Sequence, residues 1–103
     1  MKLSEMKAAG EILAEQLEDP EFRKEWERTA VARAVATRVV AYRASHGLTQ
    51  TELGLRLGMG QSAVARLESG EHEPTVTTLA RLSRTLGIEF HIDITPDTLS
   101  ITA

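Results

Sequence analysis

The sequence contains no cysteine, few aromatic residues and no long apolar run. Without cysteine there are no disulfides, thiolate metal ligands, cysteine nucleophiles or cysteine-bound iron–sulfur clusters. The histidines at positions 46, 72 and 91 do not form the helical i, i+4 pair that would indicate a metal site. No apolar run approaches the roughly 20 residues of a membrane helix, and charged residues near the N-terminus are incompatible with a signal peptide. We therefore expect a soluble cytosolic protein that binds no membrane and needs no metal or cofactor.

The length and composition of the chain are sufficient for one folded domain. The chain has 103 residues, of which 42% are hydrophobic and 26% are charged. This composition favours a folded chain, and the length favours one core rather than two. A core with only four aromatic residues favours additional stability from oligomerisation. No pairing of a nucleophile with a base and no phosphate-binding loop is visible, so we do not expect an enzyme.

The formal net charge of −3 is unevenly distributed. Residues 1–32 carry 5 basic and 8 acidic side chains, residues 33–87 carry 7 and 4, and residues 88–103 carry no basic and 3 acidic ones. All basic residues of the middle segment are arginines, which bind phosphate and guanine in a bidentate manner. A basic face on this segment would suit nucleic acid, whereas arginines scattered over a solvated helix surface are the alternative explanation.

The first 45 residues predict helices. An apolar stripe at 3-4 spacing predicts a weak helix over residues 4–18 that needs a docking partner. Asp19 and Pro20 fit the N-cap and first position of a second helix. Residues 21–45 contain neither glycine nor proline, and they predict one long helix or two nearly collinear ones. The apolar stripe changes phase near Ala30, which indicates two separate contacts, one through Phe22, Trp26 and Ala30 and one through Val31, Val35, Val39 and Tyr42.

Residues 47–87 predict short helices that end at glycines. Gly47 would end the long helix in the left-handed conformation. Thr49 and Glu52 have the spacing of a capping box that opens a short helix, and two further helices are predicted over residues 61–68 and 75–86. The expected helical core consists of Leu53, Leu57, Met59, Val64, Leu67, Leu79, Leu82 and Leu86.

After Gly87 the apolar residues recur at every second position, which predicts a strand with one apolar face. A turn at Pro96 and Asp97 and a second short strand over residues 98–102 would complete a hairpin. An isolated hairpin is marginally stable and leaves an exposed edge, so we expect this strand to pair with its copy in a homodimer. The residues expected at this contact are Ile88, Phe90, Ile92 and Ile94.

The string LTQTELGLRLGMGQSAVARLESG, from Leu48 to Gly70, resembles the helix-turn-helix of the XRE, or lambda-repressor-like, family. The likeness extends over about half of the chain, from Val31 to Gly87, and implies a mainly α fold with a five-helix DNA-binding domain. Gly54 stands where the family usually has alanine, a difference that should cost about 1 kcal/mol of helix stability. The resemblance further implies that the second helix of the motif presents its N-terminal end to the major groove.

The resemblance also implies a set of DNA-contacting positions. Gln61 can bond adenine and Arg66 guanine or phosphate, while Gln50 can bond a backbone phosphate from the N-terminus of the preceding helix. The alternative interpretation is that Gln61 and Arg66 are ordinary exposed residues that contact no DNA. The expected DNA contacts are Thr49, Gln50, Gly60, Gln61, Ser62, Ala65, Arg66, Thr75 and Thr77.

Arg43 and Glu68 match a pair that forms a buried salt bridge between the first and third helices of this family. One role for the pair is to position Arg43 near phosphate, and the other is to specify the fold. We favour the structural role, because such pairs specify geometry more reliably than they add stability.

Outside the motif, the layout resembles a narrower group, the HigA-like XRE antitoxins of toxin–antitoxin modules. These often carry a stretch like Asp19-Pro20-Glu21-Phe22, with an aromatic residue near Trp26, before a compact helix-turn-helix. The resemblance implies a small basic ribonuclease of the RelE/HigB type as partner, which an acidic N-terminal segment would attract. The expected contact residues are Phe22, Glu25 and Trp26. The alternative is that the two aromatic residues simply pack the first helix onto the second.

Three segments are therefore predicted: a helical extension over residues 1–30 that contacts the toxin, the helix-turn-helix domain over 31–87, and a dimerisation strand or hairpin over 88–103. We expect a homodimeric repressor in the bacterial cytoplasm that binds a double-stranded DNA operator, neutralises a ribonuclease toxin and represses its own operon. The alternatives are an XRE-family regulator without a toxin, and a protein-interaction module whose helix-turn-helix does not bind DNA. Salt-dependent duplex binding distinguishes this last alternative from the others.

Overall fold

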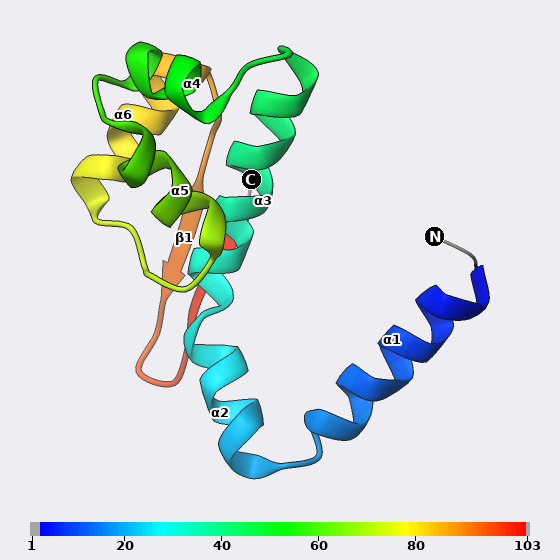
Figure 1. Cartoon of the computed structure of the whole chain (residues 1–103). Coiled ribbons are helices and arrows are strands. Elements are labelled where there is room, and N and C mark those ends of the chain that lie inside the picture. The colour runs from blue at the N-terminus through cyan, green and yellow to red at the C-terminus, as the bar shows by residue number, and fades with distance from the viewer. Residues whose placement is uncertain (1–2, 103) are drawn as a thin grey trace.

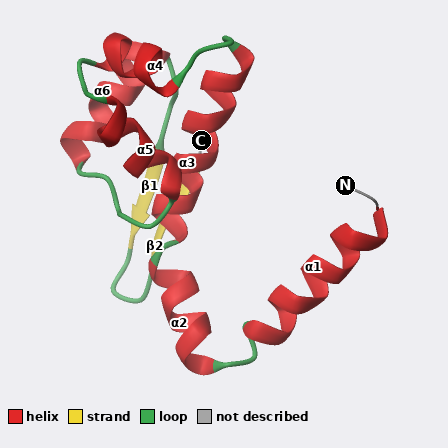
Figure 2. Cartoon of the chain, viewed as in Figure 1, coloured by secondary structure: helices red, strands yellow, loops and turns green. Residues whose placement is uncertain are grey.

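The computed structural model describes residues 3–102, and the side chains from Gly10 onward. Within this range the fold is mainly helical with one small antiparallel sheet, which confirms the predicted fold class (Figures 1 and 2). No helix in this range is long and apolar enough to cross a membrane. The elements are α1 (Leu3–Gln16), α2 (Pro20–Arg28), α3 (Ala30–Ser45), α4 (Gln50–Leu57), α5 (Gln61–Ser69), α6 (Val76–Leu86), β1 (His91–Ile94) and β2 (Leu99–Thr102).

Helices α1 and α2 project from the rest of the molecule as an arm (Figure 1). The radius of gyration is 15.4 Å, compared with about 13 Å for a compact chain of this length. As predicted, Pro20 begins α2, and the Asp19 side chain caps the helix by accepting the Glu21 N–H at 2.9 Å. The side chain of Ile12 on α1 is 56% exposed. Some of the apolar surface of α1 is therefore not covered by the residues that the structure describes.

The region predicted as one long helix or two forms two helices that meet at Thr29. The backbone of Thr29 has φ −95° and ψ 8°, which breaks the helical path. Its hydroxyl lies 3.2 Å from the carbonyl oxygen of Glu25 and 3.3 Å from that of Trp26. Beyond this break the apolar face turns toward the core, where Val31, Ala32, Val35, Ala36 and Val39 are buried.

The core lies between α3 and the three short helices α4, α5 and α6. The short helices begin and end where the caps and glycines predict. Of the predicted core residues, Leu53, Leu57, Val64, Leu79 and Leu82 are buried, and Met59, Leu67 and Leu86 are half-buried against them.

The C-terminal hairpin completes this core. Strands β1 and β2 are antiparallel, with Ile92 opposite Ile101 and Ile94 opposite Leu99. Strand β2 lies against α3, and Phe90 and Ile101 pack onto the helical core. Between residues 30 and 86 the structure has four helices, whereas the family resemblance implies five. The hairpin covers part of the helical core.

The first strand is shorter than its alternating pattern predicts. The pattern begins at Ile88, but β1 begins only at His91. Ile88 is 6% exposed, because its side chain is buried within the same chain. This residue is therefore part of the intramolecular packing, which corrects its place among the residues expected at the dimer contact.

Gly54 on α4 lies in close contact with the turn that follows the helix. A Cβ atom built on Gly54 would lie 2.5 Å from the carbonyl oxygen of Met59 and 3.4 Å from the carbonyl carbon of Gly60. The first distance is far below ordinary van der Waals contact, and the contacted atom belongs to the backbone. The sequence expectation that glycine is unfavourable here considered helix propensity alone, and the close approach of the turn reverses it.

Replacing Gly54 with alanine is expected to destabilise the fold by about 1–3 kcal/mol, as at overpacked sites, although alanine is the better helix former. Gly10→Ala is the matched control, because a Cβ atom at Gly10 on α1 meets nothing within 4 Å. Urea denaturation followed by circular dichroism measures both variants. A Gly54→Ala protein more stable than the wild type would contradict this packing.

Candidate nucleic-acid interface

Helices α4 and α5 and the turn between them form a helix-turn-helix (Figure 1). Gly58 ends α4 in the left-handed conformation, with φ 69° and ψ 35°, a conformation that glycine adopts without a steric penalty. The Met59 N–H then donates to the Gly54 carbonyl oxygen at 2.9 Å. Gly60 returns to extended geometry, with φ −77° and ψ 165°, and α5 begins at Gln61. The turn thus brings the first residues of α5 to the surface, where Gly60, Gln61 and Ser62 are exposed.

The glutamines at the N-termini of α4 and α5 contact each other. The Gln61 Nε2 donates to the Gln50 Oε1 at 2.6 Å, and the Gln50 Nε2 lies 3.5 Å from the Glu68 Oε1. Gln61 is exposed whereas Gln50 is half-buried. Gln50 therefore fixes the orientation of the Gln61 side chain, whose amide oxygen and second N–H remain available to a ligand.

A salt bridge between Arg43 and Glu68 supports this glutamine pair. The Arg43 Nη2 lies 2.8 Å from the Glu68 Oε1, and the Arg43 Nε lies 2.8 Å from the Glu68 Oε2. The Arg43 Nη1 also donates to the carbonyl oxygen of Leu48 at 3.1 Å. The Glu68 side chain is only 7% exposed, and its hydrogen bonds raise the pKa of Arg43. The bridge connects α3 to α5 and to the segment before α4, which supports the structural role favoured from the sequence.

The threonines of the expected DNA-contacting set differ in what their hydroxyls bind. Thr49 forms the predicted capping box: its Oγ1 accepts the Glu52 N–H at 3.1 Å, and the Glu52 Oε1 accepts the Thr49 N–H at 3.0 Å. The Thr75 Oγ1 accepts the Thr78 N–H at 3.1 Å. These two hydroxyls cap α4 and α6, and thereby position two helix N-termini whose dipoles favour phosphate. Thr77 is exposed in the first turn of α6.

The remaining predicted contacts lie along α5 and beside a groove. Ala65 is half-buried and Arg66 is exposed. Arg66 lines an open groove of about 310 Å³ between α5 and α6, together with His72 and Pro74. His72 is not among the residues expected at this surface from the sequence, because the loop that carries it is placed beside α5 only by the packing of α6.

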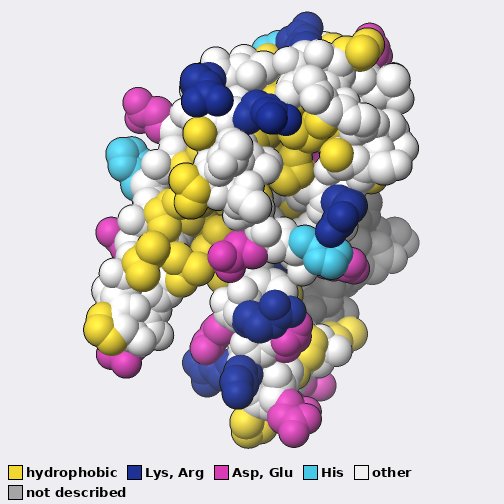
Figure 3. All heavy atoms as spheres, turned by 90° about the vertical axis from the view of Figure 1, so that its left-hand side faces the viewer, with side chains coloured by type: hydrophobic (Ala, Val, Ile, Leu, Met, Phe, Trp, Pro, Cys, Tyr) yellow, Lys and Arg dark blue, Asp and Glu magenta, His cyan; other side chains and the backbone are white. Residues whose placement is uncertain are grey.

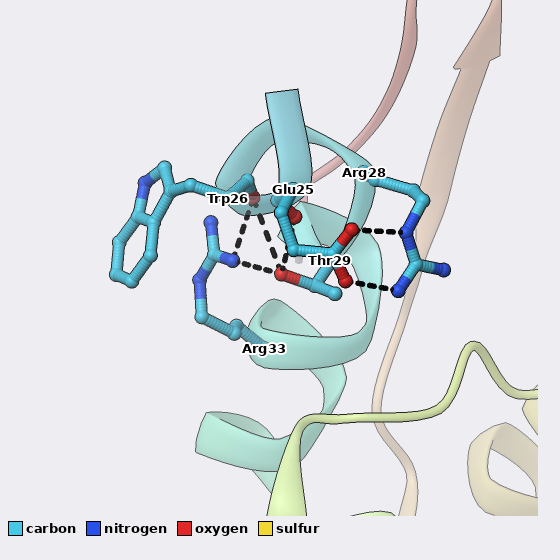
Figure 4. Close-up of polar contacts among 5 residues, drawn as sticks. All are labelled: Glu25, Trp26, Arg28, Thr29 and Arg33. Atoms are coloured by element: carbon cyan, nitrogen blue, oxygen red, sulfur yellow. Dashed lines mark hydrogen bonds and ion pairs between the residues drawn. The ribbon is translucent and has the colours of Figure 1, made fainter. Parts of the chain in front are cut away.

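The residues expected to contact a toxin lie on two sides of α2 (Figure 4). The Phe22 and Trp26 rings stack with centroids 6.3 Å apart, and the Arg33 guanidinium lies 3.5 Å from the centroid of the Trp26 ring. The Arg33 Nη1 also donates to the Trp26 carbonyl oxygen at 2.6 Å and to the Thr29 hydroxyl. Trp26 is therefore half-buried and held in a fixed orientation at the junction of α2 and α3.

Glu25 points away from Trp26 and binds Arg28. The Arg28 Nε lies 3.0 Å from the Glu25 Oε2, and its Nη2 pairs with the other carboxylate oxygen. These hydrogen bonds lower the pKa of Glu25. Its carboxylate is thus already partnered within α2.

The apolar residues expected at the dimer contact are covered to different extents. Ile88 is buried in its own chain and Phe90 is half-buried, whereas Ile92 is 38% exposed and Ile94 is 78% exposed. Figure 3 shows hydrophobic side chains gathered along the hairpin. Val76, which is 78% exposed at the start of α6, lines a groove of about 210 Å³ with Phe90 and Ile92. The surface available to a second chain thus comprises Val76, Ile92 and Ile94.

Comparison with known proteins identifies the same motif. The helix-turn-helix family matches residues 39–92. The uncharacterized HTH-type transcriptional regulator y4dJ of Sinorhizobium fredii is 36% identical over 64 residues, which cover 62% of this chain and 82% of that protein. The antitoxin HigA1 of Mycobacterium tuberculosis is 30% identical over 91 residues, which cover 88% of this chain and 61% of that protein.

An archaeal protein shows a similar match. An uncharacterized HTH-type transcriptional regulator of Methanothermobacter thermautotrophicus is 36% identical over 58 residues, which cover 56% of this chain and 84% of that protein. No solved structure matches the chain. The match to the M. tuberculosis antitoxin thus extends well beyond the helix-turn-helix, although the chain spans less than two thirds of that relative.

The capping box at Thr49 and Glu52 predicts a pH-dependent contribution to stability. The backbone N–H and then the hydroxyl of Thr49 lower the pKa of Glu52 by hydrogen bonding, and Arg56 lowers it further. A pKa that is lower in the folded chain stabilises the fold above the pKa of the unfolded chain, and this stabilisation is lost as the pH falls through the folded value. Glu52→Gln should therefore be less stable than the wild type at pH 7, and the difference should shrink as the pH falls below about 4. Urea midpoints measured from pH 7 to pH 3 test this, and a difference that stays constant over the range would contradict it.

Proposed function

The chain belongs to the helix-turn-helix family. From this premise we propose that it is a homodimeric DNA-binding repressor of the XRE type that also acts as a HigA-like antitoxin. The observation that carries the DNA-binding part is the contact between Gln61 and Gln50 at the exposed N-terminus of α5. A second chain is needed to read a palindrome, and the arm of α1 and α2 offers a surface that the helix-turn-helix does not use.

The exposed end of α5 has the chemistry to read bases in a major groove. Gln61 presents a free amide oxygen and N–H, the pair of groups that bonds adenine in a bidentate manner. Gln50 holds this amide in one orientation, which reduces the entropy lost on binding. The capped N-termini of α4 and α6, together with exposed Arg66, would contact phosphates and set the register on the duplex.

Gln61→Ala is expected to cost about 1–3 kcal/mol of binding free energy and to relax the sequence preference at one base pair. Gln50→Ala should weaken binding to all duplexes, and its effect should not add to that of Gln61→Ala, because the two side chains share a hydrogen bond. Gln16→Ala, at an exposed glutamine on α1, is the matched control. Gel-shift titrations across salt concentrations, with a site selected from random duplexes, measure these effects. Binding without salt dependence or sequence preference would contradict the DNA-binding proposal.

The proposed dimer forms through the free edge of the hairpin. Strand β2 lies against α3 and pairs with β1, so β1 carries an edge that faces no strand among residues 3–102. Pairing of β1 with its copy would give a four-stranded sheet, and it would cover the exposed side chains of Ile94 and Val76. The two copies of α5 would then have to reach successive major grooves, about 34 Å apart.

Ile94→Lys is expected to make the protein monomeric and to lower its operator affinity at least about tenfold. The fold should be retained, because the replaced side chain is 78% exposed in the single chain. Ile12→Lys is the matched control, since Ile12 is 56% exposed but lies on α1, outside both the hairpin and the helix-turn-helix. Sedimentation equilibrium measures the oligomeric state, circular dichroism measures the helix content, and gel-shift titration measures the operator affinity. An unchanged dimer in the Ile94→Lys variant would place the interface elsewhere.

The antitoxin part of the proposal is supported by the arm and by the relatives. The similarity to antitoxin HigA1 covers 88% of the chain, far more than the helix-turn-helix match. Residues 1–32 carry three more acidic than basic side chains, and a ribonuclease must be basic to hold RNA. The stacked Phe22 and Trp26 rings are rigid and half-buried, which suits aromatic anchors at a protein interface.

Trp26→Ala is expected to weaken toxin binding by about 2 kcal/mol or more, while operator binding should be unchanged. A chain that starts at Thr29 should still bind operator, because α3 to α6 and the hairpin contain all of the buried core, but it should no longer protect cells. Rescue of cells that express the ribonuclease encoded beside this gene measures protection, with Leu55→Ala as control. Full protection by the shortened chain would move the toxin site to another surface. The absence of such a ribonuclease gene would leave a regulator without a toxin.

A further inference from the structure

A second surface on the molecule combines apolar and acidic groups and lies outside both the helix-turn-helix and the Trp26 side of α2. An open groove of about 510 Å³ separates the start of α3 from the turn of the hairpin. Figure 3 shows the hairpin and α2 as two lobes with a hollow between them. Ala30, Val31 and Leu99 provide its apolar lining. Leu99 is 40% exposed, because the hairpin extends beyond the helices that cover its apolar face.

The charged groups around this groove are predominantly acidic. The carboxylates of Glu27, Glu73 and Asp97 line it, and Arg28 is its one cationic side chain. Arg28 is already bound by Glu25 through two hydrogen bonds. Neither Glu73 nor Asp97 has an ion-pair partner within 4.0 Å among the residues that the structure describes. An acidic rim of this kind repels phosphate and attracts cations.

We infer that this groove binds a segment of a partner protein that combines basic and apolar side chains. The aliphatic stem of an arginine or lysine can lie on Val31 and Leu99 while its charged end reaches Glu73 or Asp97. Long basic side chains commonly bind in this way, because the stem is apolar and only the end is charged. The groove opens to solvent, so that a segment of a folded partner can enter from the side. Nucleic acid is not a suitable occupant, because the carboxylates of Glu73 and Asp97 line the groove and would repel phosphate.

This inference rests on the proposed function in one respect: the basic ribonuclease proposed there is a partner of the required charge. It changes the expected contact surface, because Glu73 precedes α6 and Asp97 lies in the hairpin turn, far along the chain from the N-terminal arm. Arg28 lines the groove, and Figure 4 shows the side chains of Arg28 and Trp26 extending in opposite directions from α2. A partner that uses both sites would therefore enclose α2, and attraction to the acidic rim would speed its association.

A peptide titration of the labelled full-length chain tests the groove directly. The probe is an octapeptide of alternating leucine and arginine, and the comparison peptide alternates leucine and glutamate. At low salt the arginine peptide should produce saturable changes in the amide NMR signals of Ala30, Val31 and Leu99. The double variant Glu73→Gln, Asp97→Asn should weaken this binding at least about tenfold. The matched control, Glu89→Gln with Asp93→Asn, also removes two exposed carboxylates of the C-terminal region but leaves the groove intact.

If the arginine peptide binds, three outcomes would still overturn the inference: equal weakening in the control variant, equal binding of the glutamate peptide, or signal changes confined to α1 and the outer face of α2. Each would show diffuse charge attraction or apolar contact in place of a built site. A chain that binds operator and protects cells but does not bind the peptide would likewise refute the groove and leave the proposed function intact. Binding at the groove by a chain that fails to protect cells would support the groove and refute the antitoxin function.

Discussion

Glu68 accepts hydrogen bonds from Arg43 and lies within reach of Gln50, and these contacts hold α3, α4 and α5 in one arrangement. A carboxylate that is only 7% exposed must be paired, because an isolated buried charge is strongly unfavourable. Only the native packing of α5 against α3 brings the arginine to it. The pair therefore excludes alternative packings more than it adds net stability. The Gln50 Nε2 lies 3.5 Å from this carboxylate, and Gln50 in turn accepts a hydrogen bond from Gln61.

Helix α3 separates two surfaces of different chemistry. Near its C-terminal end, Arg43 supports the glutamines that would face DNA. Near its N-terminal end, Arg33 holds the Trp26 ring and carbonyl oxygen, and so fixes the orientation of α2. These arginines are ten residues apart, about 15 Å along a helix. One rigid element thus positions the glutamines of the helix-turn-helix near one end and the arm of α1 and α2 near the other.

The hairpin accounts for much of the exposed apolar surface of the molecule. Its apolar face covers the helical core through Phe90 and Ile101, but Ile94 and Leu99 extend past the helices and are exposed. Two features accompany this extension of the hairpin. One edge of β1 pairs with no strand among residues 3–102, and the hairpin turn forms one side of the acidic groove beside α2. Both features involve side chains that contribute little to the stability of a single chain, which is typical of surfaces kept for association.

The features of this protein that depend on near neighbours along the chain were predictable from its residues alone. Capping residues and glycines specify the helix ends, because a cap needs only a side chain two or three residues away and a positive φ needs only the absence of Cβ. Asp19, Thr49 and Thr75 all cap as predicted. The periodicity of apolar residues likewise specified the core side of the helices from α3 to α6. The motif residues then identified the helix-turn-helix and its exposed glutamines.

The contacts between these elements could not be predicted in the same way. Ile88 continues the alternating pattern of the strand, yet it is buried among the helices. Gly54 is unfavourable for an isolated helix, yet the backbone of Met59 leaves no room for a Cβ. Arg33 holds Trp26 across a helix break, and Glu73 and Asp97 face one groove from two distant loops. Such contacts depend on the distance between atoms that the chain does not connect directly, and that distance is set by the packing of the whole core.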